Sequence, residues 1–373
     1  MSNERSAHDD APFLDAVAEL GPALLKVLAA FDEVQRRLHP PELSRLRAAV
    51  APARAFLEEA LAAAGAETPP PRLEEFARVL LASAGHAARG LELFLADEGD
   101  ADEPMAGIAA VMGALREHSR AQAVLFPLRR AAISIDRYFL EAGAESRSAT
   151  LAEAPGTPGR SGLFNANNDP EQRGGFSFFA PEDYDEARAW PLVVALHGGF
   201  GHGGDFLWTW LREARTRGWL LLAPTSRDTT WSMLGADHDA PALTSMLAYV
   251  EERWNVDARC RLLTGLSDGG TYSLLHGLAE GSGFTALAPV AGVLHPGNFS
   301  NANLERAAGV RIRWVHGALD WMFPVQLARE GARALGEAGA DVELVEVEDL
   351  SHAYPREQNG PILEWAQGTA QNA

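Results

Sequence analysis

Ser267 lies at the centre of the stretch GLSDG, residues 265–269, which fits the pattern G-x-S-x-G. An apolar run typical of a strand precedes the pattern, and a stretch typical of a helix follows it. A sharp strand-to-helix turn holds such a serine in strained backbone geometry. The positions two residues before and after it must therefore have no bulky side chain, and they are Gly265 and Gly269. The turn lifts the hydroxyl clear of the sheet, where it can attack an ester carbonyl. Ser267 is therefore a candidate nucleophile.

Two further side chains occur where they could activate that hydroxyl. Asp320 lies in the loop VHGALDWMFPV, which follows the second predicted strand after the one that leads to Ser267. His352 lies in VEDLSHAYP, after the last predicted strand. A histidine can take the proton of the hydroxyl, and a carboxylate can hold that histidine in the correct tautomer. The chain order Ser, acid, His on an alternating scaffold is the order of a hydrolytic triad. The sequence predicts that Ser267, Asp320 and His352 form one.

Other acids and histidines compete for these roles. Glu348 and Asp349 precede His352, but a neighbour in sequence is not aimed at the far imidazole nitrogen. His197 and His316 each stand in a His-Gly turn after a strand, where a structural hydrogen bond is the simpler interpretation. Asp320 therefore remains the preferred acid of the triad.

The glycine-rich stretch PLVVALHGGFGHGGDFLW, residues 191–208, allows two interpretations. Gly199, Gly201 and Gly204 fit G-x-G-x-x-G, a pattern that can bind the phosphates of a dinucleotide. At least one strand precedes this one, however, and the next strand ends in LLAPTS without an acid to bind a ribose. The favoured interpretation is an oxyanion hole, in which the backbone N–H groups of Gly199 and Asp268 bind the carbonyl oxygen.

Several apolar side chains near these loops could form the wall of an acyl or aromatic pocket. Core packing is the alternative for each of them. Only residues 293–309 separate two later strands, too few for a large lid. The candidate substrate-binding residues are Trp208, Trp231, Trp321, Met322 and Tyr354.

Strands and helices alternate in the second part of the chain, which predicts an α/β fold with a mostly parallel sheet and helices on both faces. Chemistry in such folds lies at the carboxyl ends of the strands. The predicted strands are 174–181, 191–198, 219–226, 259–265, 285–292, 310–317 and 341–348, and the predicted helices are 205–217, 240–254, 270–281 and 324–339.

The first part of the chain is rich in Ala, Leu, Glu and Arg, and its apolar residues recur at helical spacing. Four helices follow from this spacing, with turns expected at 67–73 and 97–104, and Pro22 is expected to kink or interrupt the first. We predict an all-α helical bundle at 1–145, a linker rich in Ser, Gly and Pro at 146–162, and a catalytic domain at 163–373.

Composition excludes several classes of function. The formal net charge of −19 would repel nucleic acid and anionic membrane surfaces. The single Cys260 cannot form an internal disulfide, the first residues are acidic rather than typical of a signal peptide, and no apolar stretch is long enough to span a membrane. We expect a cytoplasmic protein. No metal-spaced cluster of His, Cys or carboxylates stands out, and no cofactor is implied.

With these residues in hand, the region from about 160 to 370 resembles the α/β-hydrolase superfamily. The segments LHGGFG, VDARCRLLTGLSDGG, VHGALDWMFPV and SHAYP are similar to those of the phospholipase/carboxylesterases, polyhydroxybutyrate depolymerases and feruloyl esterases. The resemblance implies a serine esterase on an α/β-hydrolase sheet. It does not extend to the helical bundle.

Three functional hypotheses follow. The first is a serine esterase that hydrolyses small or medium acyl esters through an acyl-enzyme. The second is an acyltransferase or thioesterase with the same triad, and the third is a catalytically inert binding or scaffold protein. The expected partner is a small-molecule ester, and the bundle is a candidate surface for a second copy or a protein partner.

Overall fold

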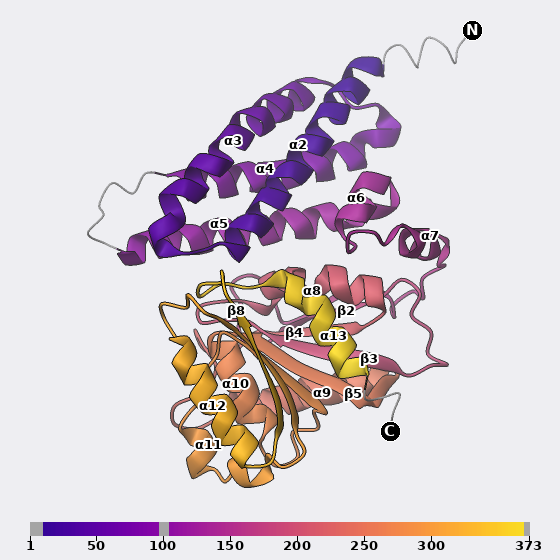
Figure 1. Ribbon diagram of the computed structural model, residues 1–373. Coiled ribbons are helices and arrows are strands. Elements are labelled where there is room, and N and C mark those ends of the chain that lie inside the picture. Colours follow the sequence, from indigo (N-terminus) through magenta and orange to yellow (C-terminus); the bar gives the residue numbers. More distant parts are fainter. Residues whose placement is uncertain (1–9, 97–103, 369–373) are drawn as a thin grey trace. The chain divides into compact units, whose positions relative to one another are not determined.

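The computed structural model describes residues 10–96 and 104–368 of the 373-residue chain. The chain divides into two compact units, Met1–Phe139 and Leu140–Ala373, which are described separately. The first contains the helices of the predicted bundle, and the second contains the sheet (Figure 1).

The segment predicted as a linker, 146–162, contains regular structure. Helix α7 (Glu145–Glu153) occupies its first half, and strand β1 (Gly162–Ala166) begins at its last residue. The Arg147 guanidinium donates hydrogen bonds of 2.6 and 2.8 Å to the Asp183 carboxylate and others of 3.3 Å to the Arg215 carbonyl. These contacts hold α7 against the rest of the second unit. The composition of the segment did not predict them.

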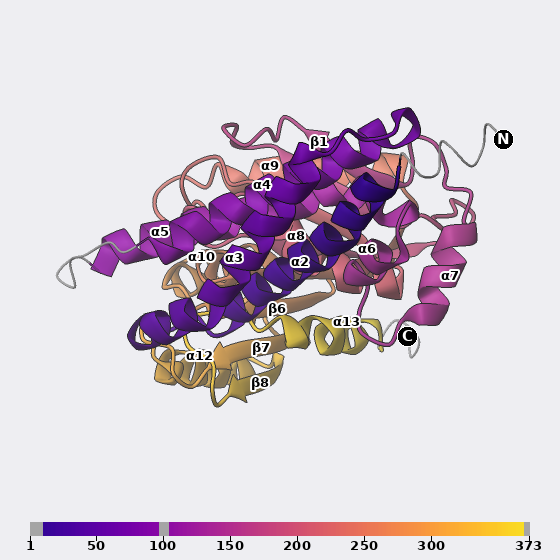
Figure 2. The same ribbon diagram turned by 90° about the horizontal axis from the view of Figure 1, so that it is seen from above.

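The bundle consists of helices with an apolar stripe along one side. They are α2 (Ala11–Arg36), α3 (Leu43–Ala66), α4 (Glu74–Leu95) and α5 (Pro104–Leu125) (Figure 2), followed by the short α6 (Ile133–Tyr138). Leu20, Leu24, Leu28 and Phe31 recur every three or four residues on α2 and are fully buried. The helix continues through Pro22, so of the two predicted effects, a kink or an interruption, the interruption is wrong.

The connections between the helices agree with the predicted turns as far as the structure extends. A loop with a short 3-10 turn at Pro71–Leu73 joins α3 to α4, within the predicted turn 67–73. Residues 97–103 of the second predicted turn lie outside the described residues. No helix within the described ranges is both long and apolar enough to span a bilayer.

The second unit contains an eight-stranded sheet in the order β1-β2-β4-β3-β5-β6-β7-β8. The pairs β1–β2 and β2–β4 are antiparallel, and all the others are parallel. This mostly parallel sheet confirms the predicted α/β-hydrolase fold class. The remaining strands are β2 (Phe176–Ala180), β3 (Trp190–Leu196), β4 (Leu220–Pro224), β5 (Val256–Leu266), β6 (Ala286–Val290), β7 (Arg311–Gly317) and β8 (Asp341–Val347).

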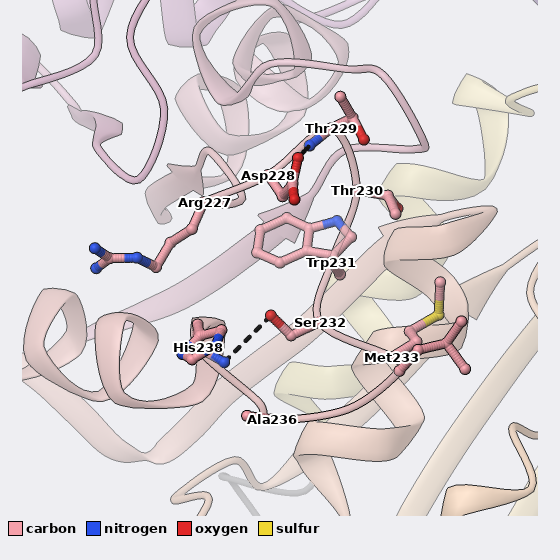
Figure 3. A pocket seen from close by; sticks show the side chains of 10 residues that line it. Arg227, Asp228, Thr229, Thr230, Trp231, Ser232, Met233, Ala236 and His238 are labelled. Atoms are coloured by element: carbon pink, nitrogen blue, oxygen red, sulfur yellow. Dashed lines mark hydrogen bonds between the residues drawn. The ribbon is translucent and has the colours of Figure 1, made fainter.

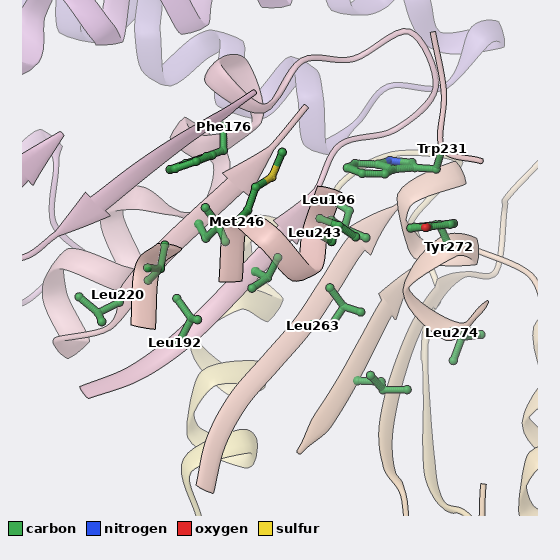
Figure 4. Close-up of a cluster of buried hydrophobic side chains, with 14 of the residues drawn as sticks. Phe176, Leu192, Leu196, Leu220, Trp231, Leu243, Met246, Leu263, Tyr272 and Leu274 are labelled. Carbon is green, nitrogen blue, oxygen red and sulfur yellow. The ribbon is translucent and has the colours of Figure 1, made fainter. Parts of the chain in front are cut away.

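Helices cover both faces of this sheet. Successive side chains of a strand point to opposite faces, and in β2 and β4 all of them are buried, so both faces must be covered. One cluster of buried side chains joins Leu192 and Leu263 of the strands to Leu243 and Tyr272 of the helices (Figure 4). The helices of this face are α9 (Asp239–Arg253), α10 (Asp268–Gly277) and α12 (Val325–Glu337), with the short α11 (Gly297–Ser300) nearby. The contacting pair α8 (Gly203–Arg217) and α13 (Asn359–Gln367) covers the other face (Figure 1).

Candidate active site

Ser267 lies on a sharp turn between β5 and α10. Its backbone has φ 55° and ψ −115°, a conformation that a non-glycine residue rarely adopts. A Cβ on Gly265 would lie 2.4 Å from the Gly269 carbonyl carbon, and one on Gly269 would lie 2.5 Å from the Leu196 oxygen. The sequence GLSDG therefore folds into the strained strand-to-helix turn that its glycines predict.

The structure brings the three predicted triad residues into one hydrogen-bonded chain. The Ser267 hydroxyl lies 2.9 Å from Nε2 of His352, and Nδ1 of His352 lies 2.8 Å from Oδ2 of Asp320. The Asp320 side chain is fully buried, and that of His352 is 11% exposed. With the imidazole proton on Nδ1, the hydroxyl donates to Nε2 and Nδ1 donates to the carboxylate. This is the arrangement in which a histidine can take the proton of a serine.

Backbone contacts hold the Asp320 loop against the His352 loop. The Leu319 N–H donates to the Leu350 carbonyl at 2.9 Å. The N–H groups of Met322 and Phe323 donate to Oδ1 of Asp320 at 3.0 and 2.7 Å, which leaves Oδ2 to face the histidine. The orientation of the carboxylate is therefore fixed by its own loop.

His316 also approaches the carboxylate of Asp320. Its Nε2 donates to the Phe323 carbonyl at 2.8 Å and lies 3.4 Å from Oδ2 of Asp320. Its Nδ1 is buried and has no hydrogen-bond partner among the described residues. Burial lowers the pKa of His316, so the ring is neutral with its proton on Nε2. His316 was predicted to have a structural role only, although the spacing His-x-x-x-Asp could have suggested this contact.

Gly199 and Asp268, the residues predicted to supply the oxyanion donors, are neighbours in the structure. A Cβ on Gly199 would be only 2.6 Å from Oδ2 of Asp268, so a larger residue at position 199 would displace this carboxylate. Asp268 is the first residue of α10, and its Oδ2 accepts a hydrogen bond of 2.6 Å from the Thr230 hydroxyl. The N–H groups at a helix N-terminus are suited to an anionic oxygen. Gly199 and Asp268 are therefore brought together, and a dinucleotide phosphate in this loop would meet the Asp268 carboxylate.

His197 and Arg173 hold the glycine loop in place. Nδ1 of His197 donates to the Gly198 carbonyl at 2.6 Å, and its Nε2 accepts from the Ser226 N–H at 3.0 Å. Burial lowers the pKa of His197 to about 3, so the ring is neutral. Arg173 donates to the Gly201 carbonyl at 2.9 Å and to the Ser226 carbonyl at 3.1 Å. Sequence reasoning missed Arg173, because no motif connects it to this loop.

A hollow of about 470 Å³ lies within the loop that follows β4. It is lined by residues 227–234 together with Ala236 and His238, and Thr230 connects it to Asp268 (Figure 3). The Trp231 ring lies in this loop, whereas the Arg227 side chain extends away from it. Of the residues in this loop, only Trp231 was predicted to take part in the site.

The five predicted substrate-binding residues differ in exposure. Trp321 and Met322 are 47% and 44% exposed on the loop that carries Asp320. Trp231 is buried, stacks on Tyr272 and donates from its indole N–H to the His197 carbonyl at 2.7 Å. Trp208 is buried on α8.

Tyr354 is also buried, and its hydroxyl donates to Asn359 at 2.7 Å. Its ring lies edge-on to Phe206 and Trp210 of α8. For Trp208 and Tyr354 the core-packing alternative fits the structure, because both side chains are buried, Trp208 on α8 and Tyr354 against it. No group of three or more His, Cys, Asp or Glu within the described ranges is placed to hold a metal ion.

Comparisons with known proteins give structural likenesses only. No protein-family model matches the chain, and neither does any curated protein sequence. A thermostable esterase is 21% identical with a TM-score of 0.42, over 56% of this chain and 60% of that one. A ferulic acid esterase is 16% identical with a TM-score of 0.44, over 55% and 96%. An acetyl xylan esterase from Aspergillus awamori is 15% identical with a TM-score of 0.44, over 56% and 99%. We base the functional proposal on the chain's own residues.

Proposed function

We propose that the protein is a serine esterase that hydrolyses carboxylic esters through an acyl-enzyme. The observation that carries this proposal is the continuous chain from Ser267 through His352 to Asp320, with contacts of 2.9 and 2.8 Å. The strained backbone of Ser267 supports it further, because such strain is retained where it serves a function. An inert scaffold would have no need of either feature.

In the first half of the reaction, the Ser267 oxygen attacks the ester carbonyl while Nε2 of His352 takes its proton. Asp320 stays ionised and stabilises the imidazolium that forms. The N–H groups of Gly199 and Asp268 bind the negatively charged oxygen, and loss of one such donor costs about 3 to 4 kcal/mol in other hydrolases. His352 then returns the proton to the leaving alcohol.

In the second half, water attacks the acyl group on Ser267, and His352 again acts first as base and then as acid. The protein needs no metal for either half, because proton transfer and charge stabilisation are supplied by side chains and backbone. We therefore expect a metal chelator to leave the hydrolysis rate unchanged. A loss of activity that added metal restores would contradict this mechanism.

The experiment that tests the proposal is hydrolysis of p-nitrophenyl esters, from acetyl to long acyl chains, by the wild type and by Ser267→Ala. We expect the wild type to be active and the variant to lose at least about four orders of magnitude in kcat, as in other triad enzymes. Ser282→Ala is a matched control, because its hydroxyl donates to the Gly277 carbonyl at the far end of α10. It should keep full activity.

Two outcomes would overturn the proposal: an inactive wild type, or activity in Ser267→Ala equal to that of the wild type. A fluorophosphonate label followed by peptide mass spectrometry gives an independent readout. The label should attach to Ser267 and should be absent from His352→Ala, which lacks the base.

Product analysis distinguishes hydrolysis from acyl transfer, since both pass through the same acyl-enzyme. The wild type is incubated with an ester and a competing alcohol or thiol. We expect the free acid to dominate at low alcohol concentration. A product that consists mainly of the new ester or thioester would instead identify an acyltransferase.

A further inference from the structure

The Asp268 carboxylate lies beside the proposed oxyanion hole, and no step of the mechanism uses it. Its Oδ2 would lie 2.6 Å from a Cβ on Gly199, so the carboxylate lies against the backbone that supplies one oxyanion donor. Its own backbone N–H supplies the other. The Asp268 side chain is partly exposed and is held by the Thr230 hydroxyl at 2.6 Å.

This carboxylate has no cationic partner within the described ranges. Arg173, which supports the glycine loop, donates to the carbonyls of Gly201 and Ser226 and to the Ser226 hydroxyl. Arg227 and Asp228 are adjacent, exposed and opposite in charge, so at a distance their effects largely cancel. The formal net charge of −19 adds to the negative potential.

An unpaired carboxylate beside an oxyanion hole opposes the charge that develops on the substrate. Its position in the first turn of α10 offers a partial compensation, because a negative charge stabilises a helix N-terminus. A carboxylate that pointed away from the site would stabilise the N-terminus of α10 equally well. The position of the Asp268 carboxylate against Gly199 therefore points to an effect on which substrates the site binds.

We propose that Asp268 selects substrates by charge: it disfavours esters whose acyl group carries a second negative charge and favours neutral or cationic ones. This inference rests on the proposed esterase function and names the substrate class of the same site. An anionic group a few ångströms from the carbonyl would be repelled by Asp268, and an ammonium would be attracted. At the dielectric of a partly exposed site the effect is about three- to thirtyfold in kcat/KM.

The test compares three p-nitrophenyl esters of equal acyl length: the hexanoate, the hydrogen adipate and the 6-aminohexanoate. They differ in the terminal group, which is neutral, anionic or cationic. The measured quantity is the ratio of kcat/KM for each charged ester to that for the hexanoate. A ratio cancels any uniform change in activity that a substitution beside Ser267 causes.

Asp268→Asn removes the charge and keeps an oxygen that can accept from Thr230. We expect it to raise the adipate ratio and lower the aminohexanoate ratio, each by about three- to thirtyfold at low salt. The change should shrink at about 0.5 M salt, since salt screens charges at this distance. Thr230→Val is the matched control, because it removes the same hydrogen bond and leaves the charge. Its ratios should equal those of the wild type.

The outcomes separate this inference from the proposed function. Unchanged ratios in Asp268→Asn, with an active wild type, would overturn the charge selection and leave the esterase intact. Equal shifts in Thr230→Val would also overturn it, because they would assign the effect to loop order. A wild type that hydrolyses none of the three esters would contradict the esterase itself.

Discussion

At the scale of single residues, two neutral histidines support the site without belonging to the proposed triad. His197 holds the carbonyl of Gly198 and the N–H of Ser226, and His316 holds the carbonyl of Phe323 beside Asp320. Burial lowers the pKa of each ring. A buried ring that must stay neutral connects the stability of the fold to pH.

His197 should make the protein less stable in mild acid. Its pKa is about 3 in the folded protein against the ordinary histidine value of 6.5, so between these values the unfolded chain binds a proton that the folded chain does not. The stabilisation is complete above pH 6.5 and is lost as the pH falls towards 3, at up to about 1.4 kcal/mol per pH unit. His197→Gln should flatten this slope in urea unfolding at a series of pH values. A slope equal to that of the wild type would contradict the assignment.

His316 should act as a positioning residue for Asp320. In His316→Phe the Phe323 carbonyl loses its donor and Oδ2 of Asp320 loses a nearby N–H, so we expect kcat to fall by about ten- to a hundredfold, equivalent to about 1 to 3 kcal/mol. His316→Gln, whose amide can donate, should recover part of the loss. The pH profile of kcat is the discriminating readout: a merely structural role would leave its acid limb unchanged.

At the scale of elements, the close packing of α10 on β3 sets the position of Ser267 relative to the end of the sheet. Gly269 allows this approach, since a Cβ there would lie 2.5 Å from the carbonyl oxygens of both Leu196 and His197. Backbone atoms cannot move aside as a flexible side chain can. The helix, and the serine at its N-terminus, would have to shift.

Gly269→Ala should therefore cost both stability and activity. We expect a loss of about 1 to 3 kcal/mol in the free energy of unfolding, as for other overpacked sites, and a fall in kcat from the displaced serine. Gly336→Ala in α12 is the matched control, because its Cβ would meet nothing within 4 Å. It should be neutral or stabilise the protein by up to about 1 kcal/mol. Chemical denaturation followed by ester hydrolysis measures both effects.

At the scale of the whole molecule, the two compact units differ in their tryptophan content. All nine tryptophans lie in the unit Leu140–Ala373, so tryptophan fluorescence reports that unit alone. The four long helices of the other unit contribute to the far-ultraviolet circular dichroism. Fluorescence therefore follows the second unit by itself, whereas the circular dichroism follows the helices of both units.

Phe31→Ala should lower the thermal midpoint of part of the circular dichroism change and leave the fluorescence midpoint in place. Phe31 is fully buried against Phe94 with ring centroids 6.1 Å apart, and its truncation should cost about 3 to 5 kcal/mol. Leu263→Ala, fully buried in β5, should lower the fluorescence midpoint. If both signals shifted together in each variant, the units would unfold as one.

Local pattern in the sequence determined the fold class, most elements and the candidate residues. Alternation of apolar segments predicts β2 to β8, because a parallel sheet buries both faces of its strands, and the glycines around Ser267 predict the strained turn. Strand β1 was missed, since GLFNA has only two large apolar residues, and α13 was missed because it follows the last motif.

Only the tertiary structure decided which side chains meet across the sheet edge. The hydrogen bond from Thr230 to Asp268 and the hydrogen bonds of Arg173 to Gly201 and Ser226 join residues from different loops. It also decided that Tyr354 is buried, because exposure depends on how a loop packs on α8. Periodicity and motifs record local backbone preferences, whereas these contacts depend on where the parallel strands bring their carboxyl ends together.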